Sequence, residues 1–165
     1  MALKDKTSDF VYKQAPDFSL LDDSGREISL SDFSGKYLLI YFYPKDLTPG
    51  CTTQACALRD TLSELKDLGL EVIGVSCDSV ESHQKFKAKH ELNFPLLADV
   101  DKKMVLDYGV WVEKSMYGKK YMGVQRDSFL INKTGKIIKH YVKVKPAEHA
   151  EQLLKDMRKI DEIDV

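Results

Sequence analysis

The sequence predicts an α/β fold in which a mixed central sheet is flanked by helices and carries an N-terminal β-hairpin extension. Two nearly unbroken apolar runs, at 36–44 and 70–76, are typical of strands buried on both faces of a sheet. Each run is followed by a segment with the pattern or the capping residues of a helix. The 165 residues contain no linker and no internal repeat, so we expect a single domain spanning 1–165.

The first half of the chain carries recognisable start and stop signals. In "FSLLDDSGREISLSDF" two short alternating runs flank the turn residues 23–25, which predicts a hairpin. A central strand follows at 36–44. A helix is then predicted from Thr48, a favourable N-cap that precedes a proline, to Gly69, a residue suited to end it. Residues 70–76 form the next strand.

The second half continues the alternation. The pattern predicts a helix at 78–91 capped by Asp78 or Ser79, a strand at 94–99, and a short helix at 101–109 closed by Gly109. Two strands at 128–132 and 137–142 form a hairpin, and Pro146 opens a final helix at 146–160. This order of strands and helices is that of a thioredoxin-like fold with extra N-terminal strands.

Composition excludes several classes of function. Lys and Arg total 25 and Asp and Glu total 26, so nothing favours a nucleic acid or an anionic membrane surface as partner. The charged N-terminal segment lacks a long apolar run, so we expect no signal peptide and no membrane anchor. Three cysteines are too few for a secreted disulfide scaffold, which favours a reducing compartment and a cytoplasmic location.

The stretch "PKDLTPGCTTQAC" places two cysteines at the start of the first long helix. Cys51 falls in the first turn, where free backbone N–H groups and the positive end of the helix dipole favour a thiolate over a thiol. This position makes Cys51 a candidate nucleophile. The alternative is that Cys51 is only a small apolar residue of the core.

Cys56 lies five residues further along the same helix. At about 100° per residue the two side chains point about 140° apart, so Cys51 faces the core and Cys56 faces solvent. The two Cα atoms are then about 8.7 Å apart. Because a disulfide tolerates at most about 7 Å, the thiols cannot bond while the helix is intact.

Other uses of the two thiols fit poorly. A zinc site needs further ligands, and Cys77, His83 and His90 do not have a recognisable zinc spacing, so we expect no metal. The C-x₂-C motif of disulfide oxidoreductases is absent. A third scheme fits better: Cys51 is oxidised to a sulfenic acid, and the helix start opens so that Cys56 can condense with it.

The segments "FYPKDLTPGCTTQAC", "VIGVSCDSVESHQKF" and "FPLLAD" resemble the peroxiredoxins, specifically the atypical 2-Cys, Q-type branch known as bacterioferritin comigratory proteins. The resemblance extends from about residue 15 to the last helix. Pro44, Thr48 and Cys51 match the P-x₃-T-x₂-C signature of the family. Cys56 matches the cysteine with which this branch forms a Cys51–Cys56 disulfide within one subunit.

The resemblance implies a thiol-dependent reduction of hydrogen peroxide or organic hydroperoxides, with Cys51 as nucleophile. Thr48 would aim its hydroxyl at the peroxide, although a simple N-cap is the alternative. Gly50 would offer a backbone N–H and room for a close approach, and Pro44 would shield the pocket. The family also implies Arg126 as the cation beside the sulfur. The family more often has a small hydroxyl residue after this arginine, whereas Asp127 is an acidic neighbour that offers the guanidinium a competing partner.

Further residues receive structural interpretations. We expect Arg59 to be an exposed i,i+4 partner on the helix and Cys77 to be a semi-buried thiol without a catalytic role. Three aromatic residues are expected to lie near Arg126: Trp111, Tyr117 and Tyr121.

The resemblance implies no metal, haem or flavin, and recycling of the disulfide by thioredoxin or a similar dithiol protein. We expect a monomer, with a weak dimer as the alternative. Two other functions stay open on the sequence alone: a protein disulfide oxidoreductase on the same fold, and a redox-sensing or chaperone-like binding module.

Overall fold

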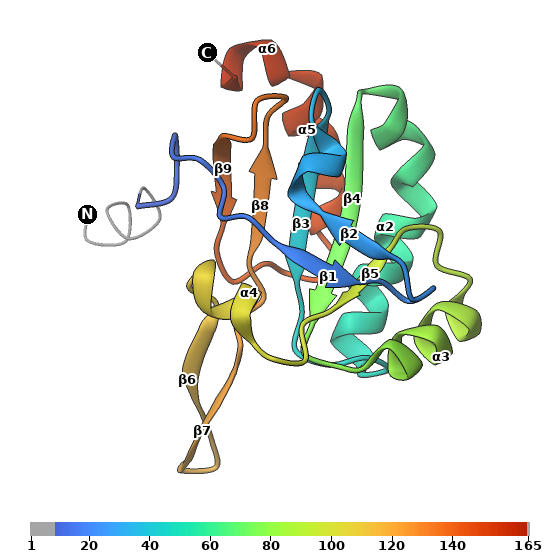
Figure 1. Cartoon of the computed structure of the whole chain (residues 1–165), viewed down its shortest axis with the longest axis vertical. Helices are drawn as coiled ribbons and strands as arrows, with labels where there is room; N and C mark the ends of the chain where they lie inside the picture. Colours follow the sequence, from blue (N-terminus) through green and yellow to red (C-terminus); the bar gives the residue numbers. More distant parts are fainter. Residues whose placement is uncertain (1–8, 165) are drawn as a thin grey trace.

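The computed structural model describes residues 9–164, and the segment 1–8, for which we expect no targeting signal, lies outside the described residues. A five-stranded sheet has the order β5-β4-β3-β8-β9, with β3, β4 and β5 parallel and β8 and β9 antiparallel (Figure 1). These strands are β3 (Tyr37–Phe42), β4 (Leu70–Ser76), β5 (Leu96–Ala98), β8 (Ser128–Ile131) and β9 (Ile137–Tyr141). The predicted mixed sheet is confirmed.

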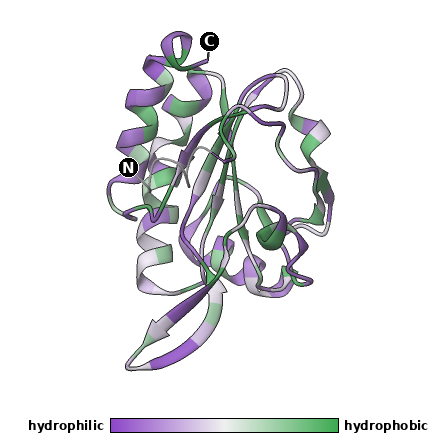
Figure 2. Ribbon diagram, turned by 90° about the vertical axis from the view of Figure 1, so that its left-hand side faces the viewer, coloured by the Kyte–Doolittle hydropathy of each residue, from purple (hydrophilic) through white to green (hydrophobic). Residues whose placement is uncertain are grey.

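Helices cover both faces of this sheet, as Figure 2 shows from the side. On one face lie α2 (Pro49–Asp67), α3 (Val80–His90) and α5 (His149–Arg158). On the other lie α4 (Lys103–Asp107) and the N-terminal segment. Alternate residues of β3 enter the two cores, Leu39 and Tyr41 on the α2 side and Leu38 and Ile40 on the other, which explains its nearly continuous apolar sequence.

The local signals account for most element boundaries. The predicted N-terminal hairpin is present as β1 (Ser19–Leu21) and β2 (Glu27–Ser29). Helix α2 begins after Thr48, and Gly69 follows it with φ of 89°, a backbone conformation that favours glycine. The N-cap of α3 is Ser79, whose side chain accepts a hydrogen bond from the Ser82 amide.

The last helix begins later than predicted. α5 starts at His149, whereas Pro146 lies in the preceding turn, closed by a hydrogen bond from the Glu148 amide to the Lys145 carbonyl. The Pro146 ring packs beside Gly50 at the start of α2, 3.8 Å from where a Cβ of that glycine would stand. The proline therefore fits against α2 instead of opening α5.

The sequence did not predict a protruding ribbon formed by β6 (Trp111–Met116) and β7 (Lys119–Val124). It extends away from the body of the molecule at the end of the sheet nearest α4 (Figure 1). Its turn residues, Tyr117 and Gly118, both have positive φ, but tyrosine is not a usual turn signal. Two short elements were also missed, η1 (Leu30–Phe33) and α6 (Ile160–Ile163). In the described part of the chain, no helix has the length and apolarity to cross a membrane.

The packing of α2 against the sheet gives a stability prediction. Leu58 is fully buried in the core beneath α2, whereas Ser63 on the same helix is exposed. Leu58→Ala should lower the free energy of unfolding by about 2–5 kcal/mol because it leaves a cavity. Ser63→Ala, the matched control, should change it by at most about 0.5 kcal/mol. Urea denaturation of both variants measures the difference, and equal stabilities would contradict this packing.

Candidate active site

Cys51 lies in the first turn of α2 with its side chain turned into the core. Its exposed fraction is 1%, and it packs in the same cluster as Tyr41 and Ala55. The helix signals explain this placement, because Thr48 occupies the N-cap and Pro49 the first helical position. The amides of Gly50 and Cys51 therefore belong to the first turn of the helix, where backbone N–H groups lack helical partners.

The Arg126 guanidinium contacts the Cys51 sulfur from the segment between β7 and β8. Its Nη2 donates a hydrogen bond to Cys51 Sγ at 3.2 Å, and its Nη1 donates to Gln54 Oε1 at 2.7 Å. Nη2 also stands 3.3 Å from where a Cβ of Gly50 would be, so the glycine permits this close approach. The Arg126 carbonyl accepts from the Val144 amide at 2.7 Å, which fixes the backbone beside the site.

Asp127 does not compete with Cys51 for the Arg126 guanidinium. The Asp127 carboxylate is buried and faces a different set of donors. It lies 2.8 Å from His140 Nε2 and accepts from the Gln125 side chain at 3.0 Å and from the Lys143 amide at 2.9 Å. Because the Asp127 carboxylate contacts these three groups, the Arg126 guanidinium contacts the Cys51 sulfur and not Asp127.

Thr48 and Pro44 flank the loop that leads into α2. Thr48 is the N-cap residue, but its hydroxyl donates to the Lys45 carbonyl at 2.8 Å and makes no capping hydrogen bond. The interpretation of its side chain as a simple cap is therefore wrong. The hydroxyl proton is committed to Lys45, which leaves the lone pairs of the oxygen available to accept a hydrogen bond. Pro44 follows β3 and is half-buried.

Cys56 is half-buried and, like Cys51, is a free thiol. The two cysteines sit in one unbroken helix, and Asp60 and Ser63 beyond Cys56 are exposed. The buried Cys51 and the partly exposed Cys56 confirm the prediction that the two side chains face different ways.

A buried polar cluster anchors the loop before α2. The Asp46 carboxylate accepts from Tyr43 Oη at 2.5 Å and Ser82 Oγ at 2.8 Å, and it lies 2.7 Å from His83 Nδ1. His83 Nε2 lies 2.9 Å from the Leu97 carbonyl, which can only accept. Because both ring nitrogens face acceptors, the contacts favour the doubly protonated ring. Burial alone would lower its pKa, but the hydrogen bond and charge of Asp46 outweigh burial and raise it.

Several other interpretations can be tested against their contacts. Arg59 donates to Asp60 at 2.9 Å and to the His90 carbonyl at 2.6 Å, so the expected i,i+4 pairing is wrong and the side chain instead joins α2 to the end of α3. Cys77 is half-buried as predicted, and burial raises the pKa of its thiol to about 11.

The three aromatic residues expected near Arg126 differ in position. Tyr121 lines a cleft with Arg126, but Tyr117 is 98% exposed at the turn between β6 and β7, so its predicted position near Arg126 is wrong. Trp111 packs against the core on the α4 side, with the Lys102 ammonium 5.5 Å from its ring centre.

Sequence reasoning missed Gln54. This side chain is fully buried, its oxygen holds Arg126, and its Nε2 has no hydrogen-bond partner among the described residues. It stands three residues after Cys51, on the same face of α2. The available signal was a glutamine among the apolar core positions of an amphipathic helix, which calls for a polar partner.

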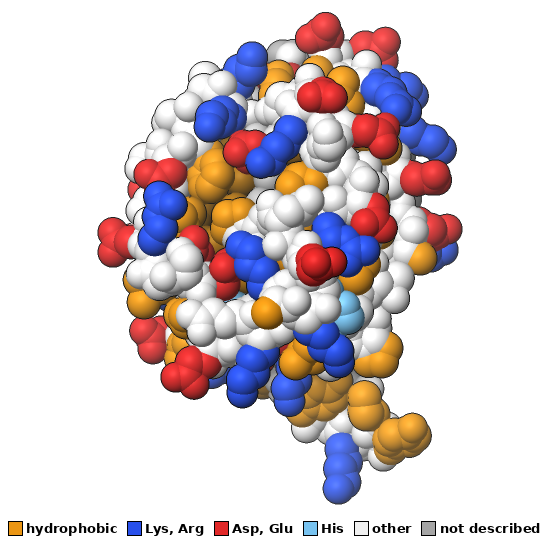
Figure 3. All heavy atoms as spheres, turned by 90° about the vertical axis from the view of Figure 1, so that its right-hand side faces the viewer, with side chains coloured by type: hydrophobic (Ala, Val, Ile, Leu, Met, Phe, Trp, Pro, Cys, Tyr) orange, Lys and Arg blue, Asp and Glu red, His pale blue; other side chains and the backbone are white. Residues whose placement is uncertain are grey.

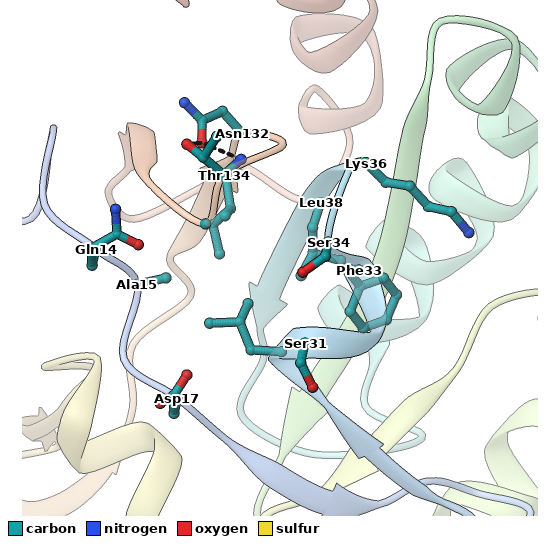
Figure 4. A pocket seen from close by; sticks show the side chains of 13 residues that line it. Gln14, Ala15, Asp17, Ser31, Phe33, Ser34, Lys36, Leu38, Asn132 and Thr134 are labelled. Carbon is teal, nitrogen blue, oxygen red and sulfur yellow. Dashed lines mark hydrogen bonds between the residues drawn. The ribbon is translucent and has the colours of Figure 1, made fainter.

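One hollow borders Arg126 and another lies elsewhere, and no thiol lines either of them. A cleft of about 450 Å³ borders Arg126, between the β6–β7 ribbon and the loop after β9. A cavity of about 420 Å³ lies near the start of β3, where Gln14, Leu38 and Asn132 are among its walls, and no thiol lines it (Figure 4). Within the described residues there is no group of three or more His, Cys, Asp or Glu side chains able to hold a metal ion.

Comparison with known sequences agrees with this geometry. A profile described as the AhpC/TSA family matches residues 11–140. Peroxiredoxin Bcp of Bacillus subtilis (strain 168) is 49% identical over 150 residues, covering 89% of this chain and 96% of the relative. Peroxiredoxin Bcp of Escherichia coli (strain K12) is 48% identical over 140 residues, covering 85% of this chain and 90% of the relative.

A solved structure of a bacterioferritin comigratory protein is also similar to this chain. The Xanthomonas campestris bacterioferritin comigratory protein, studied for alkyl peroxide reduction through trapped intermediate and ligand complexes, matches with a TM-score of 0.82 and 38% identity over 87% of this chain and 91% of that chain. The fold and the buried thiol at a helix start define a thioredoxin-fold thiol protein. The chain belongs to the AhpC/TSA family of peroxiredoxins, in the Q-type, bacterioferritin comigratory branch.

Two buried histidines predict opposite dependences of stability on pH. The raised pKa of His83 means that the folded protein binds the extra proton between about pH 6.5 and that higher pKa, so its contribution is complete below 6.5 and is lost as pH rises. Burial lowers the pKa of His149 to about 4. Because the folded protein keeps this ring neutral, the free energy of unfolding falls as pH falls from 6.5 to 4.

The free energy of unfolding of His83→Gln and His149→Gln, measured by urea denaturation from pH 4 to 9, tests both signs. The stability advantage of the wild type over His83→Gln should shrink above pH 6.5. Its advantage over His149→Gln should shrink below pH 6.5. Differences that do not change with pH would contradict the assigned protonation states.

Proposed function

We propose that this protein is a thiol-dependent peroxidase that reduces hydrogen peroxide and organic hydroperoxides. The observation that carries the proposal is the 3.2 Å hydrogen bond from Arg126 to the Cys51 sulfur in the first turn of α2. Membership of the peroxiredoxin family supports it, as does the study of a structural relative for alkyl peroxide reduction.

The first step is an in-line displacement at one oxygen of the peroxide. The Cys51 thiolate attacks the terminal oxygen, an S–O bond forms, and the O–O bond breaks. The departing oxygen takes a proton and leaves as an alcohol, or as water when the substrate is hydrogen peroxide. Two electrons pass from sulfur to the peroxide, and Cys51 becomes a sulfenic acid.

The surrounding groups hold the peroxide in line and stabilise the charge that develops on the departing oxygen. Arg126 and the free amides of Gly50 and Cys51 are the donors for that charge. Thr48, whose hydroxyl proton is committed to Lys45, accepts a hydrogen bond from the O–H of the substrate. Pro44 shields the reacting atoms from water, which strengthens these interactions.

The second step joins the two cysteines. The Cys56 thiol attacks the oxidised sulfur of Cys51, the S–S bond forms, and the hydroxyl group leaves with the thiol proton as water. Because about 8.7 Å separates the Cα atoms in an intact helix, the first turns of α2 must unwind. A helix terminus opens at low cost, and a neutral sulfenic acid holds Arg126 less firmly than a thiolate does.

The cycle closes when a dithiol protein, thioredoxin or a similar one, exchanges its thiols with the Cys51–Cys56 disulfide and carries the two electrons. No metal or organic cofactor takes part in these steps. We place the protein in the cytoplasm because its few cysteines suit a reducing compartment, and we propose that it acts as a monomer.

Three serine variants test the proposal. Cys51→Ser should abolish turnover of peroxide, because the sulfur that attacks is gone. Cys56→Ser should keep the first oxidation but halt turnover with thioredoxin, because the disulfide cannot form. Cys77→Ser is the control and should keep both activities. Peroxide consumption with thioredoxin and mass spectrometry of the protein after one equivalent of peroxide measure these outcomes.

Full thioredoxin-dependent turnover by Cys56→Ser would contradict the role of Cys56. Oxidation of wild-type Cys51 no faster than that of a free thiol at equal thiolate fraction would favour a disulfide oxidoreductase. Oxidation without repeated turnover in the presence of the reductant would favour a redox-sensing module.

A further inference from the structure

The cleft beside Arg126 is also lined by two lysines, Lys114 and Lys143, which have no part in the proposed peroxidase steps. Arg126 forms part of its wall and also donates to Cys51, so this one side chain connects the cleft to the sulfur, which does not itself line the cleft. The remaining walls come from β6, from β7 and from the loop after β9. Basic side chains gather where the ribbon leaves the body of the molecule (Figure 3). The inference below rests on the proposed function and concerns its substrate.

Lys114 is directed inward by the alternation of β6. Val112 and Lys114 are half-buried on one face of the strand, whereas Glu113 and Ser115 on the other face are exposed. The cross-strand partner of Lys114 is Tyr121, which also lines the cleft.

Gly123, which has no side chain, leaves room on β7 for the aliphatic part of the Lys114 side chain. A Cβ at Gly123 would stand 3.3 Å from Lys114 Cδ and 3.4 Å from the ring of Tyr121, so the absence of a side chain leaves room for both. The stem of the lysine thus lies across β7 on the face that looks into the cleft.

The charge of Lys114 is not neutralised by the protein. Among the described residues, neither Lys114 nor Arg126 has a carboxylate within 4.0 Å. The acidic residue of the cleft, Glu113, pairs with the exposed Lys120 at 3.7 Å. Burial and the nearby charge of Arg126 lower the pKa of Lys114, whereas the Cys51 thiolate acts in the opposite direction. Lys143 adds a third cation at the rim.

We propose that this cleft binds the carboxylate of an anionic organic hydroperoxide, with Lys114 and Arg126 as the cationic contacts. A carboxylate beside Lys114 would supply its missing counter-charge and offset its repulsion with Arg126, whose own charge also faces the Cys51 sulfur. Val112, Val144 and Tyr121 provide an apolar wall for the carbon skeleton of the substrate. The shared guanidinium places the peroxide group of such a molecule toward Cys51.

The test compares acids with their methyl esters. Two pairs are used: cumene hydroperoxide with a para carboxylate, and 3-hydroperoxy-3-methylbutanoate, each with its ester. At pH 7 the carboxylates are ionised. The rate of Cys51 oxidation is measured in a single turnover before any reductant is added, so that effects on the reductant do not enter. The quantity compared is the acid-to-ester ratio of rate constants in each variant.

Lys114→Met keeps the stem but removes the charge, and it should lower this ratio by about tenfold at low ionic strength in at least one pair, since that corresponds to one moderately screened charge contact. Lys114→Arg should retain most of the preference. Lys119→Met, an exposed position of the same ribbon that does not line the cleft, should leave the ratio unchanged. In the wild type, added salt should move the ratio toward that of Lys114→Met, a measurement that needs no variant.

An acid-to-ester ratio that is the same in the wild type and in Lys114→Met, for both pairs and at all salt concentrations, would overturn the anion site. Hydrogen peroxide separates this failure from that of the proposed function: rapid oxidation of Cys51 by hydrogen peroxide with no acid preference rejects only the anion site. If Lys114→Met affects only the later reaction with thioredoxin, the cations contact the reductant instead of the substrate, and the proposal is wrong.

Discussion

The hydrogen bond between the Arg126 guanidinium and the Cys51 sulfur is the contact on which the rest of the site depends. It joins the start of α2 to the segment before β8, two parts of the chain that are 75 residues apart. Gln54 fixes one end of the guanidinium, Gly50 leaves space for the other, and Val144 holds the backbone of the arginine. A polar contact is thereby built beside the core cluster under α2, where an electrostatic interaction is stronger than in water.

In the proposed cycle the same helix start must also open, because Cys56 cannot meet Cys51 while α2 is wound. The loop before α2 and the first turn of α2 differ in the number of side-chain contacts that hold them. Before the helix, Asp46 is tied to Tyr43 and His83 in a fully buried cluster, so the loop after β3 is anchored. Beyond it, the first turn of α2 lacks a side-chain cap, and the hydrogen bond from Arg126 to Cys51 is one of the contacts that hold it. In the proposed cycle, oxidation of that sulfur weakens this one contact of the turn.

The parts of the fold that could be predicted from sequence are those determined by local chemistry. The strand at 70–76 begins and ends as predicted because its apolar run is bounded by clear signals. The β6–β7 ribbon was missed because its polar strands are joined by an unusual Tyr-Gly turn. In the site, helix-start rules and spacing identified Cys51 and Cys56, but Arg126 came from family resemblance alone. Gln54 was missed because it contacts Arg126, 72 residues away, which sequence spacing does not reveal. Lys114 was missed because the ribbon that carries it was not predicted.

The most direct test of the central contact is the rate of Cys51 oxidation by hydrogen peroxide in Arg126→Gln, measured by stopped flow in a single turnover. Arg59→Gln serves as a control because that arginine joins α2 to α3 away from the sulfur. The account predicts that Arg126→Gln remains folded and reacts at least about 10²-fold more slowly, a loss typical of removing one preorganised donor, while Arg59→Gln reacts like the wild type. A wild-type rate in Arg126→Gln would contradict it.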